Sequence, residues 1–143
     1  MSCPLCHPDD ENLLWRDAHC RVIRVDDADH PGYCRVVWHA HVAEMTDLDA
    51  AQRDHLMRVV FAAESAMRRC FEPAKINLAS LGNMVPHLHW HLIARHADDA
   101  QFPDPVWAPR RRASAPRAAV ADGDLLAALE DALAQEGIDS CRM

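Results

Sequence analysis

The stretch Pro86-His87-Leu88-His89-Trp90-His91-Leu92-Ile93 places three histidines in strict alternation with large apolar residues. A period of two is typical of a half-buried β-strand, whose successive side chains point to opposite faces of a sheet. We therefore expect Leu88, Trp90 and Leu92 to face a core, and the three histidines to line an exposed face. Same-face neighbours on a strand lie about 6.6 Å apart, so one substrate could contact two or three of these rings.

The composition suits one domain with a continuous core, because the chain has 143 residues and half of them are hydrophobic. Its 15 basic and 22 acidic residues give a formal charge of -7, which argues against a partner bound by bulk charge, such as a nucleic acid polymer. No apolar run approaches the roughly 18 residues of a membrane span, and no signal peptide is apparent. We expect a cytoplasmic protein with no membrane partner.

The cysteines are then expected as free thiols or metal ligands, because the cytoplasm keeps thiols reduced. Cys3 and Cys6 have a spacing that suits two thiolates on one tetrahedral metal, although two ligands are only half of such a site. A pair of small, reduced apolar side chains is the alternative. The full set is Cys3, Cys6, Cys20, Cys34, Cys70 and Cys141.

Further strands are expected where β-branched and aromatic residues gather. Two lie on either side of a turn at residues 17–18, one ends at His39, and one covers residues 75–81. The last of these leads into a turn at Gly82-Asn83 and should form a hairpin with the histidine strand.

A long helix is expected after Thr46 and Asp49, whose spacing resembles a capping box, and before Pro73. His55 should be a solvated neighbour of its apolar face. That face consists of residues at helical spacing, namely Leu56, Val59, Val60, Ala63, Met67, Cys70 and Phe71.

Residues 97–117 lose this periodicity, gain four prolines and are expected to form an extended segment over the body. Within it, the run 110–112 of three arginines is either solvated surface or a contact to phosphate or a partner. A short last helix should follow, capped at residues 122–124, bearing Leu125, Leu126, Leu129 and Leu133 and ending at Gly137.

A row of imidazoles suits three chemistries. Histidines two apart on a strand can ligate one metal ion, if carboxylates or further histidines complete the site. A neutral imidazole can act as a nucleophile while its neighbours hold the leaving group and the oxygens of the electrophile. Imidazoles can also be purely structural, but strict alternation of three disfavours this alternative.

The stretch from Asn77 to Ile93 resembles the signature of the histidine triad (HIT) superfamily of nucleotide hydrolases and transferases. Residues 36–42 resemble the upstream strand of the same superfamily, and the resemblance extends from the cysteine pair to about Arg95. It implies an α+β, HIT-like fold with an antiparallel sheet of about five strands, one long helix and a short C-terminal helix. Residues 1–97 would form the domain core and residues 98–143 an extension packed on it, in a symmetric homodimer that binds nucleotides.

The resemblance also implies roles for individual residues. His89 is the nucleophile that attacks the α-phosphorus, with a backbone carbonyl on its other ring nitrogen to fix the tautomer, and His91 binds the phosphoryl oxygens. Asn77 lies near phosphate and ribose, and Asn83 contacts the leaving side. Met84 stands where many relatives have a Ser or Thr that donates to phosphate.

Zinc-bearing branches of the superfamily suggest a metal site. In them, an N-terminal Cys-x-x-Cys joins the histidine that ends the upstream strand and the first triad histidine, which correspond to Cys3, Cys6, His41 and His87. A closed Cys2His2 set implies a structural zinc, and no organic cofactor is expected. Without zinc, His87 would act with the catalytic histidines by holding the leaving group or orienting His89.

The expected activity is hydrolysis at the α-phosphorus of a dinucleoside polyphosphate or a nucleoside phosphoramidate. Nucleotidyl transfer is the less expected reaction, because the transferases of the superfamily are much longer chains. A nucleotide-binding module with little turnover is an alternative, suggested by Asn83 and Met84. A metalloenzyme whose triad holds a catalytic ion would need nearby carboxylates, and none lies between Asn77 and His96.

Overall fold

The computed structural model of the protein describes residues 2–139 and contains one five-stranded antiparallel sheet. The strand order is β1-β2-β3-β5-β4, so β1 and β4 are the edges. The elements are β1 (Asn12–Arg16), β2 (Cys20–Arg24), β3 (Tyr33–Trp38), the 3₁₀ turn η1 (Met45–Asp47), α1 (Ala50–Phe71), β4 (Lys75–Ala79), β5 (His89–Arg95) and α2 (Asp122–Gln135). This α+β architecture confirms the expected fold.

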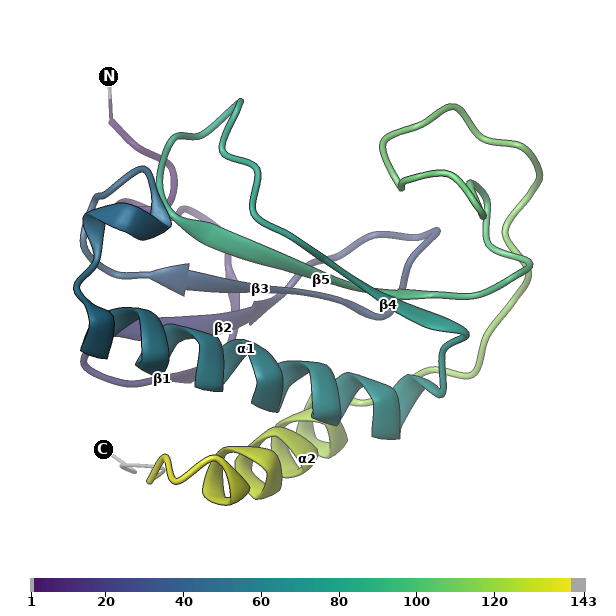
Figure 1. The fold of residues 1–143 in the computed structure, drawn as a ribbon. Coiled ribbons are helices and arrows are strands. Elements are labelled where there is room, and N and C mark those ends of the chain that lie inside the picture. The colour runs from purple at the N-terminus through teal and green to yellow at the C-terminus, as the bar shows by residue number, and fades with distance from the viewer. Residues whose placement is uncertain (1, 140–143) are drawn as a thin grey trace.

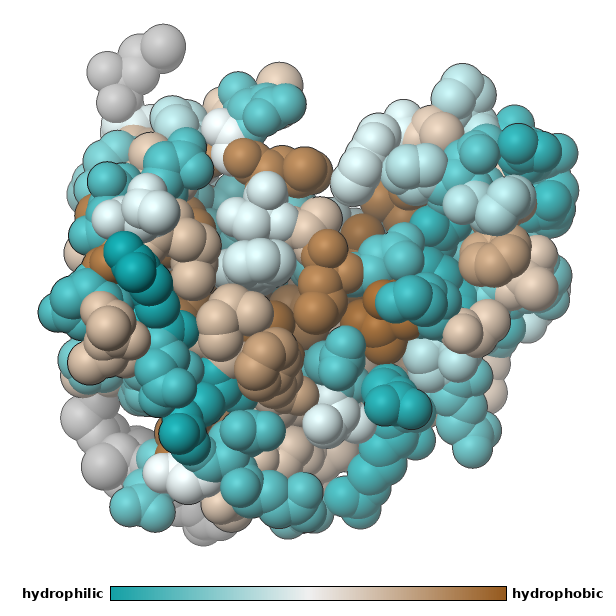
Figure 2. Space-filling view, viewed as in Figure 1, coloured by the Kyte–Doolittle hydropathy of each residue, from teal (hydrophilic) through white to brown (hydrophobic). Residues whose placement is uncertain are grey.

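Both α-helices cover the same face of the sheet (Figure 1). The apolar stripe of α1 packs on side chains of β2, β3 and β5, and α2 adds Leu125, Leu129 and Leu133 to the same core. The other face carries no helix. It is flanked by the loop 80–88 and by the segment after β5, and Figure 2 shows a notch between these two projections.

The start of α1 differs from the expectation at Thr46. Thr46 belongs to η1, and Asp49 is the N-cap of α1, where its carboxylate accepts from the backbone N–H of Gln52 at 2.9 Å. Gln52 closes the capping box by accepting from the N–H of Asp49 at 2.9 Å. The predicted capping box was one turn too early. Two capping boxes follow each other here, the first at the start of η1 and the second at the start of α1. The helix ends with Glu72 in the left-handed region, before Pro73 as expected.

The hairpin of β4 and β5 is present, but its connection is not a tight turn at Gly82-Asn83. The register pairs Ala79 with His91, so residues 80–88 form a long loop. The segment before β5 is held by the end of β3 instead, since the N–H of Leu88 donates to Val42 O at 2.7 Å and the N–H of Trp38 donates to Leu88 O at 3.1 Å. This pairing places His87 before the strand.

The helix α2 is joined to the sheet through Asp122. Its carboxylate accepts from Arg24 at 2.9 Å and from Asn12 at 3.1 Å, so it does not cap the helix, and Ala121 is the N-cap. Gly137, with φ of 75°, follows the helix end as expected. No helix within residues 2–139 is long and apolar enough to cross a bilayer.

The three consecutive arginines are bound within the chain. Arg110 pairs with Asp29 and Arg111 with Asp104, while Arg112 donates to the carbonyl oxygens of Asp99 and Phe102. All three residues are exposed, as the solvated-surface alternative expects, and their side chains also tie the segment after β5 to itself and to the loop between β2 and β3.

Candidate active site and metal centre

Two of the three alternating histidines stand on the helix-free face of β5. His89 is in register with Val37 and His91 with Arg35 on β3, and paired residues of an antiparallel sheet share a face. The two rings meet edge to face, with centroids 4.8 Å apart. The expectation of an exposed row was wrong, because His89 and His91 are only 8% and 9% exposed. As expected, Leu88 and Leu92 are buried on the core side.

The hydrogen bond of His89 determines which ring nitrogen is free. Nδ1 lies 2.6 Å from the carbonyl oxygen of His87 and donates to it, since a carbonyl can only accept. The lone pair is therefore on Nε2. Burial lowers the pKa of His89, and the positive charge of Arg35 lowers it further. A neutral imidazole with one open nitrogen has the properties of a nucleophile.

His91 is held by a residue that the sequence patterns did not indicate. The hydroxyl of Tyr33 lies 2.9 Å from Nδ1 of His91, and the two rings meet edge to face. Burial, with contributions from His89 and Arg35, lowers the pKa of His91 to about 4, so its ring is neutral at pH 7. Tyr33 could have been found by extending the β3 alternation one residue back, which puts it on the histidine face.

His87 is directed away from this pair. It is fully buried, and Nε2 donates to the carbonyl oxygen of Trp38 at 2.6 Å, which leaves the lone pair on Nδ1. That atom lies 3.4 Å from both Sγ of Cys3 and Sγ of Cys6, and 3.1 Å from Nδ1 of His41. The structure therefore brings together the four residues named as candidate ligands, from three distant parts of the chain.

The four atoms have the arrangement of a tetrahedral metal site. All lie within 4.8 Å of one another, and Sγ of Cys6 is 3.4 Å from Nδ1 of His41. Metal–sulfur and metal–nitrogen bonds of about 2.3 and 2.0 Å in a tetrahedron separate the ligand atoms by about 3.3–3.8 Å. The carbonyl on His87 Nε2 is the outer hydrogen bond that metal-bound histidines usually make. The donor set thus fits an ion, and it leaves no position for a substrate.

The two thiols of this cluster differ electrostatically. Burial tends to raise the pKa of Cys3, but hydrogen bonds from the backbone of Cys6 and Leu5 outweigh it, and the pKa of Cys3 is lowered. Burial and the neighbouring Cys3 raise the pKa of Cys6. One lowered and one raised pKa are expected where two thiols share one site, because the first thiolate opposes the formation of the second.

The three residues proposed to bind substrate lie on β4 and in the loop that follows it. Asn77 is in register with Ile93 of β5, two residues past His91, and its side-chain oxygen accepts a hydrogen bond from Arg95 at 2.9 Å. Asn83 and Met84 lie in the loop 80–88, and Met84 is 94% exposed. Within residues 2–139, no hydrogen bond joins any of these three side chains to His89 or His91.

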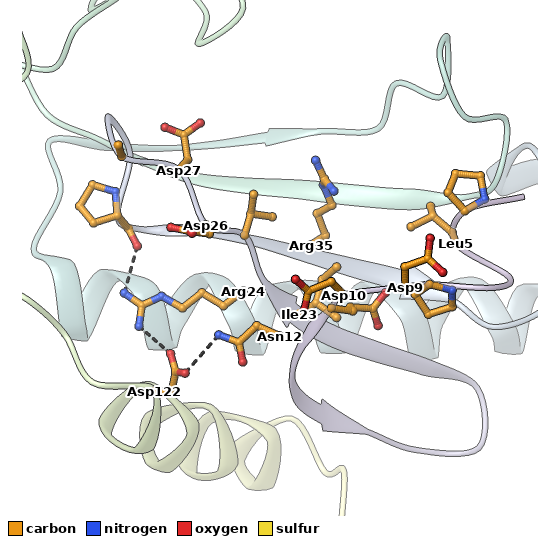
Figure 3. Close-up of a pocket in the computed structure, with 16 residues that line it drawn as sticks. Leu5, Asp9, Asp10, Asn12, Ile23, Arg24, Asp26, Asp27, Arg35 and Asp122 are labelled. Atoms are coloured by element: carbon orange, nitrogen blue, oxygen red, sulfur yellow. Dashed lines mark hydrogen bonds and ion pairs between the residues drawn. The ribbon is translucent and has the colours of Figure 1, made fainter.

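A hollow of about 1040 Å³ adjoins the histidine face and was not anticipated (Figure 3). The N-terminal segment and the loop between β2 and β3 form its walls, and Ile23 of β2 and Arg35 of β3 lie between them. Its lining includes six carboxylates, those of Asp9, Asp10, Glu11, Asp26, Asp27 and Asp122. No sequence motif could indicate it, because the lining comes from segments that only the sheet brings together.

A second group of potential ligands, Asp17, Cys20 and His55, serves to hold α1. The carboxylate of Asp17 accepts from Nε2 of His55 at 2.7 Å and from the backbone N–H groups of His19 and Cys20. Burial raises the pKa of the Cys20 thiol, so this sulfur stays protonated. The expectation that His55 is merely solvated was wrong, since it connects α1 to the β1–β2 turn.

Comparison with known proteins agrees with this geometry. The family model described as "HIT domain" matches residues 8–98. The chain belongs to the HIT family. A histidine triad protein from Marinobacter aquaeolei VT8 is 30% identical, with a TM-score of 0.68, over 88% of this chain and 90% of that one. One from Bradyrhizobium japonicum is 29% identical, with a TM-score of 0.67, over 85% of this chain and 90% of that one.

More distant HIT structures share the fold. A hypothetical histidine triad nucleotide-binding protein from Sulfolobus tokodaii strain 7 is 15% identical, with a TM-score of 0.63, over 93% of each chain. No curated protein matches. Family membership makes this chain a HIT module of the nucleotide hydrolase and transferase kind.

Proposed function

We propose that this HIT protein hydrolyses a nucleotide conjugate at its α-phosphorus through a nucleotidyl-histidine on His89. The observation that carries the proposal is the hydrogen bond from His89 Nδ1 to the carbonyl oxygen of His87, at 2.6 Å. It fixes the tautomer with the lone pair on Nε2, beside the ring of His91, while burial lowers the pKa of His89 and favours the neutral ring. An imidazole in this state needs no separate base to act as a nucleophile.

The reaction has two steps. Nε2 of His89 forms a bond to the α-phosphorus, and the bond to the leaving group breaks, with the electron pair going to that group. Water then attacks the same phosphorus, the phosphorus–nitrogen bond breaks, and the products are a nucleoside monophosphate and free His89. When Tyr33 donates its hydroxyl to Nδ1 of His91, the ring proton of His91 is on Nε2 and can be donated to a phosphoryl oxygen.

The substrate classes we propose are dinucleoside polyphosphates and nucleoside phosphoramidates. The hollow beside β3 is large enough for a nucleoside, since small-ligand pockets measure about 300–1,000 Å³. Its carboxylates are suitable acceptors for the hydroxyl groups of a ribose. The same carboxylates oppose a polyanion, which supports a small nucleotide rather than a nucleic acid polymer as the partner.

We further propose that Cys3, Cys6, His41 and His87 hold a structural zinc. The ion would join the N-terminal segment to the start of β5 and would take no part in the chemistry, because four protein ligands close the site. The described cysteines are all free, which supports the reducing, cytoplasmic setting that we propose for the protein.

A homodimer is also proposed. β4 is an edge strand, so within residues 2–139 no strand pairs with its outer side, where a second chain could extend the sheet. The exposed Phe61 on α1 is the kind of apolar side chain that a subunit contact would cover.

The covalent step is tested by mass spectrometry after brief incubation with diadenosine polyphosphate or adenosine phosphoramidate. We expect a nucleotidyl adduct on His89, and at least about a 10⁴-fold lower rate for His89→Ala, as for loss of other catalytic nucleophiles. The control His96→Ala removes an imidazole beyond the other end of β5 and should retain the rate. A wild-type protein that binds nucleotide but forms neither adduct nor product would be a binding module instead.

The metal is tested by elemental analysis of protein purified without chelator. We expect about one equivalent of zinc per chain, and loss of both the zinc and several degrees of melting temperature in Cys3→Ser. Cys70→Ser, at a thiol of α1 outside the cluster, is the control. The assignment would be contradicted if the wild-type protein contained no metal and had the same melting temperature as Cys3→Ser.

A further inference from the structure

Arg35 is a cation on the histidine face that has no hydrogen-bond partner among the described residues. It lies at the centre of β3, in register with His91 on one side and with Ile23 on the other. Its Nε is buried and donates to no acceptor within residues 2–139, and its guanidinium lies over the ring of Tyr33, 5.7 Å from the ring centroid. Leaving a buried donor unsatisfied is unfavourable, so this arrangement requires an explanation.

Arg35 is half-buried, and the two fully buried arginines on this face both have carboxylate partners. Arg21 binds Glu11 through two nitrogens, at 2.6 and 3.0 Å, and Arg95 binds Asp99 through two nitrogens, at 2.8 and 3.0 Å. The chain therefore supplies carboxylates where it buries an arginine for structure. Arg35 lacks one although acidic residues line the adjoining hollow, and Figure 3 shows its side chain directed from β3 toward the neighbouring strand without a bond to any of them.

We propose that Arg35 binds the α-phosphate of the nucleotide together with His91. The inference rests on the proposed function. A guanidinium presents its N–H groups in a planar fork that matches two phosphate oxygens. His91 is neutral and can donate only one hydrogen bond, so it cannot balance the phosphate charge. Arg35 supplies the positive charge directly opposite.

The charge distribution of the hollow favours this placement of the ligand. Its carboxylates repel a phosphate and accept from hydroxyl groups, so the uncharged nucleoside belongs among them. Arg35 is where the hollow meets the histidine pair, because it lines the hollow and is in register with His91. A nucleotide with its ribose in the hollow would therefore present its first phosphate to Arg35 and the α-phosphorus to His89.

The test is isothermal titration calorimetry of the full chain with adenosine and with AMP, neither of which is turned over. We expect Arg35→Gln to weaken AMP binding about 10- to 100-fold, the effect of losing a charged hydrogen-bonding partner, and to leave adenosine binding within about twofold. Arg35→Lys keeps the charge without the fork and should recover part of the loss. Arg16→Gln, at an exposed arginine of β1, is the matched control and should leave both affinities unchanged.

The outcomes separate this inference from the proposed function. Equal weakening of adenosine and AMP by Arg35→Gln would show a nucleoside contact and overturn the inference, as would unchanged binding of both ligands. In either case an adduct on His89 would still support the proposed function. Conversely, a phosphate-dependent loss in Arg35→Gln without any adduct would support Arg35 as a phosphate ligand in a module with little turnover.

Discussion

The two ends of β5 carry polar groups in opposite states. At the C-terminal end, Arg95 and Asp99 are each 2% exposed at the side chain and bind each other at 2.8 Å. Arg95 also donates to Asn77 and to the carbonyl oxygen of Asp104. At the other end, His89 retains an open Nε2 and Arg35 a buried, unpaired Nε.

The difference indicates which end is built for stability and which for chemistry. Buried polar groups are normally paired, because an unpaired one costs about 1–3 kcal/mol. At the C-terminal end Arg95 and Asp99 follow this rule and connect β5 to the segment after it, although Nδ1 of His30, 4.0 Å from the Asp99 carboxylate, has no hydrogen-bond partner among the described residues. The His89 end departs from it, and such departures are expected where a ligand completes the hydrogen bonds.

The largest effect is expected from breaking the paired end. Asp99→Asn leaves Arg95 charged and buried without its carboxylate, and should lower the free energy of unfolding by about 3–5 kcal/mol. Urea denaturation followed by tryptophan fluorescence measures this change. Asp98→Asn makes the same substitution one residue away at an exposed ion pair with Arg117, and should cost less than about 1 kcal/mol. Equal effects of the two variants would contradict the contrast.

Breaking the open end should instead reduce the rate. His91→Asn removes a donor to the phosphoryl oxygens, and we expect about a 10²-fold lower kcat/KM, near the loss for a deleted oxyanion donor. Tyr33→Phe removes only the hydrogen bond that orients His91, so its effect should be smaller and in the same direction. Steady-state kinetics with the best substrate measures both. A fully active His91→Asn would show that its ring only packs against His89.

Changes in pH should affect the stability contributed by each end in a separate pH window. The pKa of His91 falls from 6.5 to about 4 on folding, so the unfolded chain binds a proton that the folded chain does not, and stability declines as pH falls from about 6.5 to 4. Burial tends to raise the pKa of Asp99, but hydrogen bonds from Arg95 outweigh it and hold the pKa below 3.8. The stability from Asp99 is therefore complete above that value and declines as pH falls below it.

Melting temperatures of the variants between pH 3 and 8 distinguish these windows. His91→Asn should flatten the profile between pH 4 and 6.5, and Asp99→Asn should flatten it only below about pH 4. If both variants changed the pH dependence of the melting temperature in the same pH range, the two ends would not titrate independently.

The features that the sequence predicted are those set by local pattern. The period of two placed Leu88 and Leu92 in the core, and the helical period of α1 identified its buried face. The Cys-x-x-Cys spacing, with the family resemblance, identified four residues whose ligand atoms do come together. The roles of His89 and His91 remain predictions that the experiments above address.

The features that were missed depend on pairing between distant segments. The loop 80–88 replaces a tight turn because Leu88 bonds to the residues after β3, and no local propensity encodes that partner. Tyr33, Arg35 and the hollow became part of the site through the β3–β5 register and the fold of the N-terminal segment. The salt bridge of His55 with Asp17 likewise spans 38 residues.

His87 serves two neighbours through two different groups. Its ring faces the cysteines, while its carbonyl oxygen holds Nδ1 of His89. Anything that displaces the ring, including a chelator or oxidation of the thiols, would also turn the peptide group that orients His89. Inactivation by a chelator or an oxidant would then result from a misaligned His89 ring. The oxidation state of Cys3 and Cys6 would change the turnover rate although neither thiol contacts the substrate.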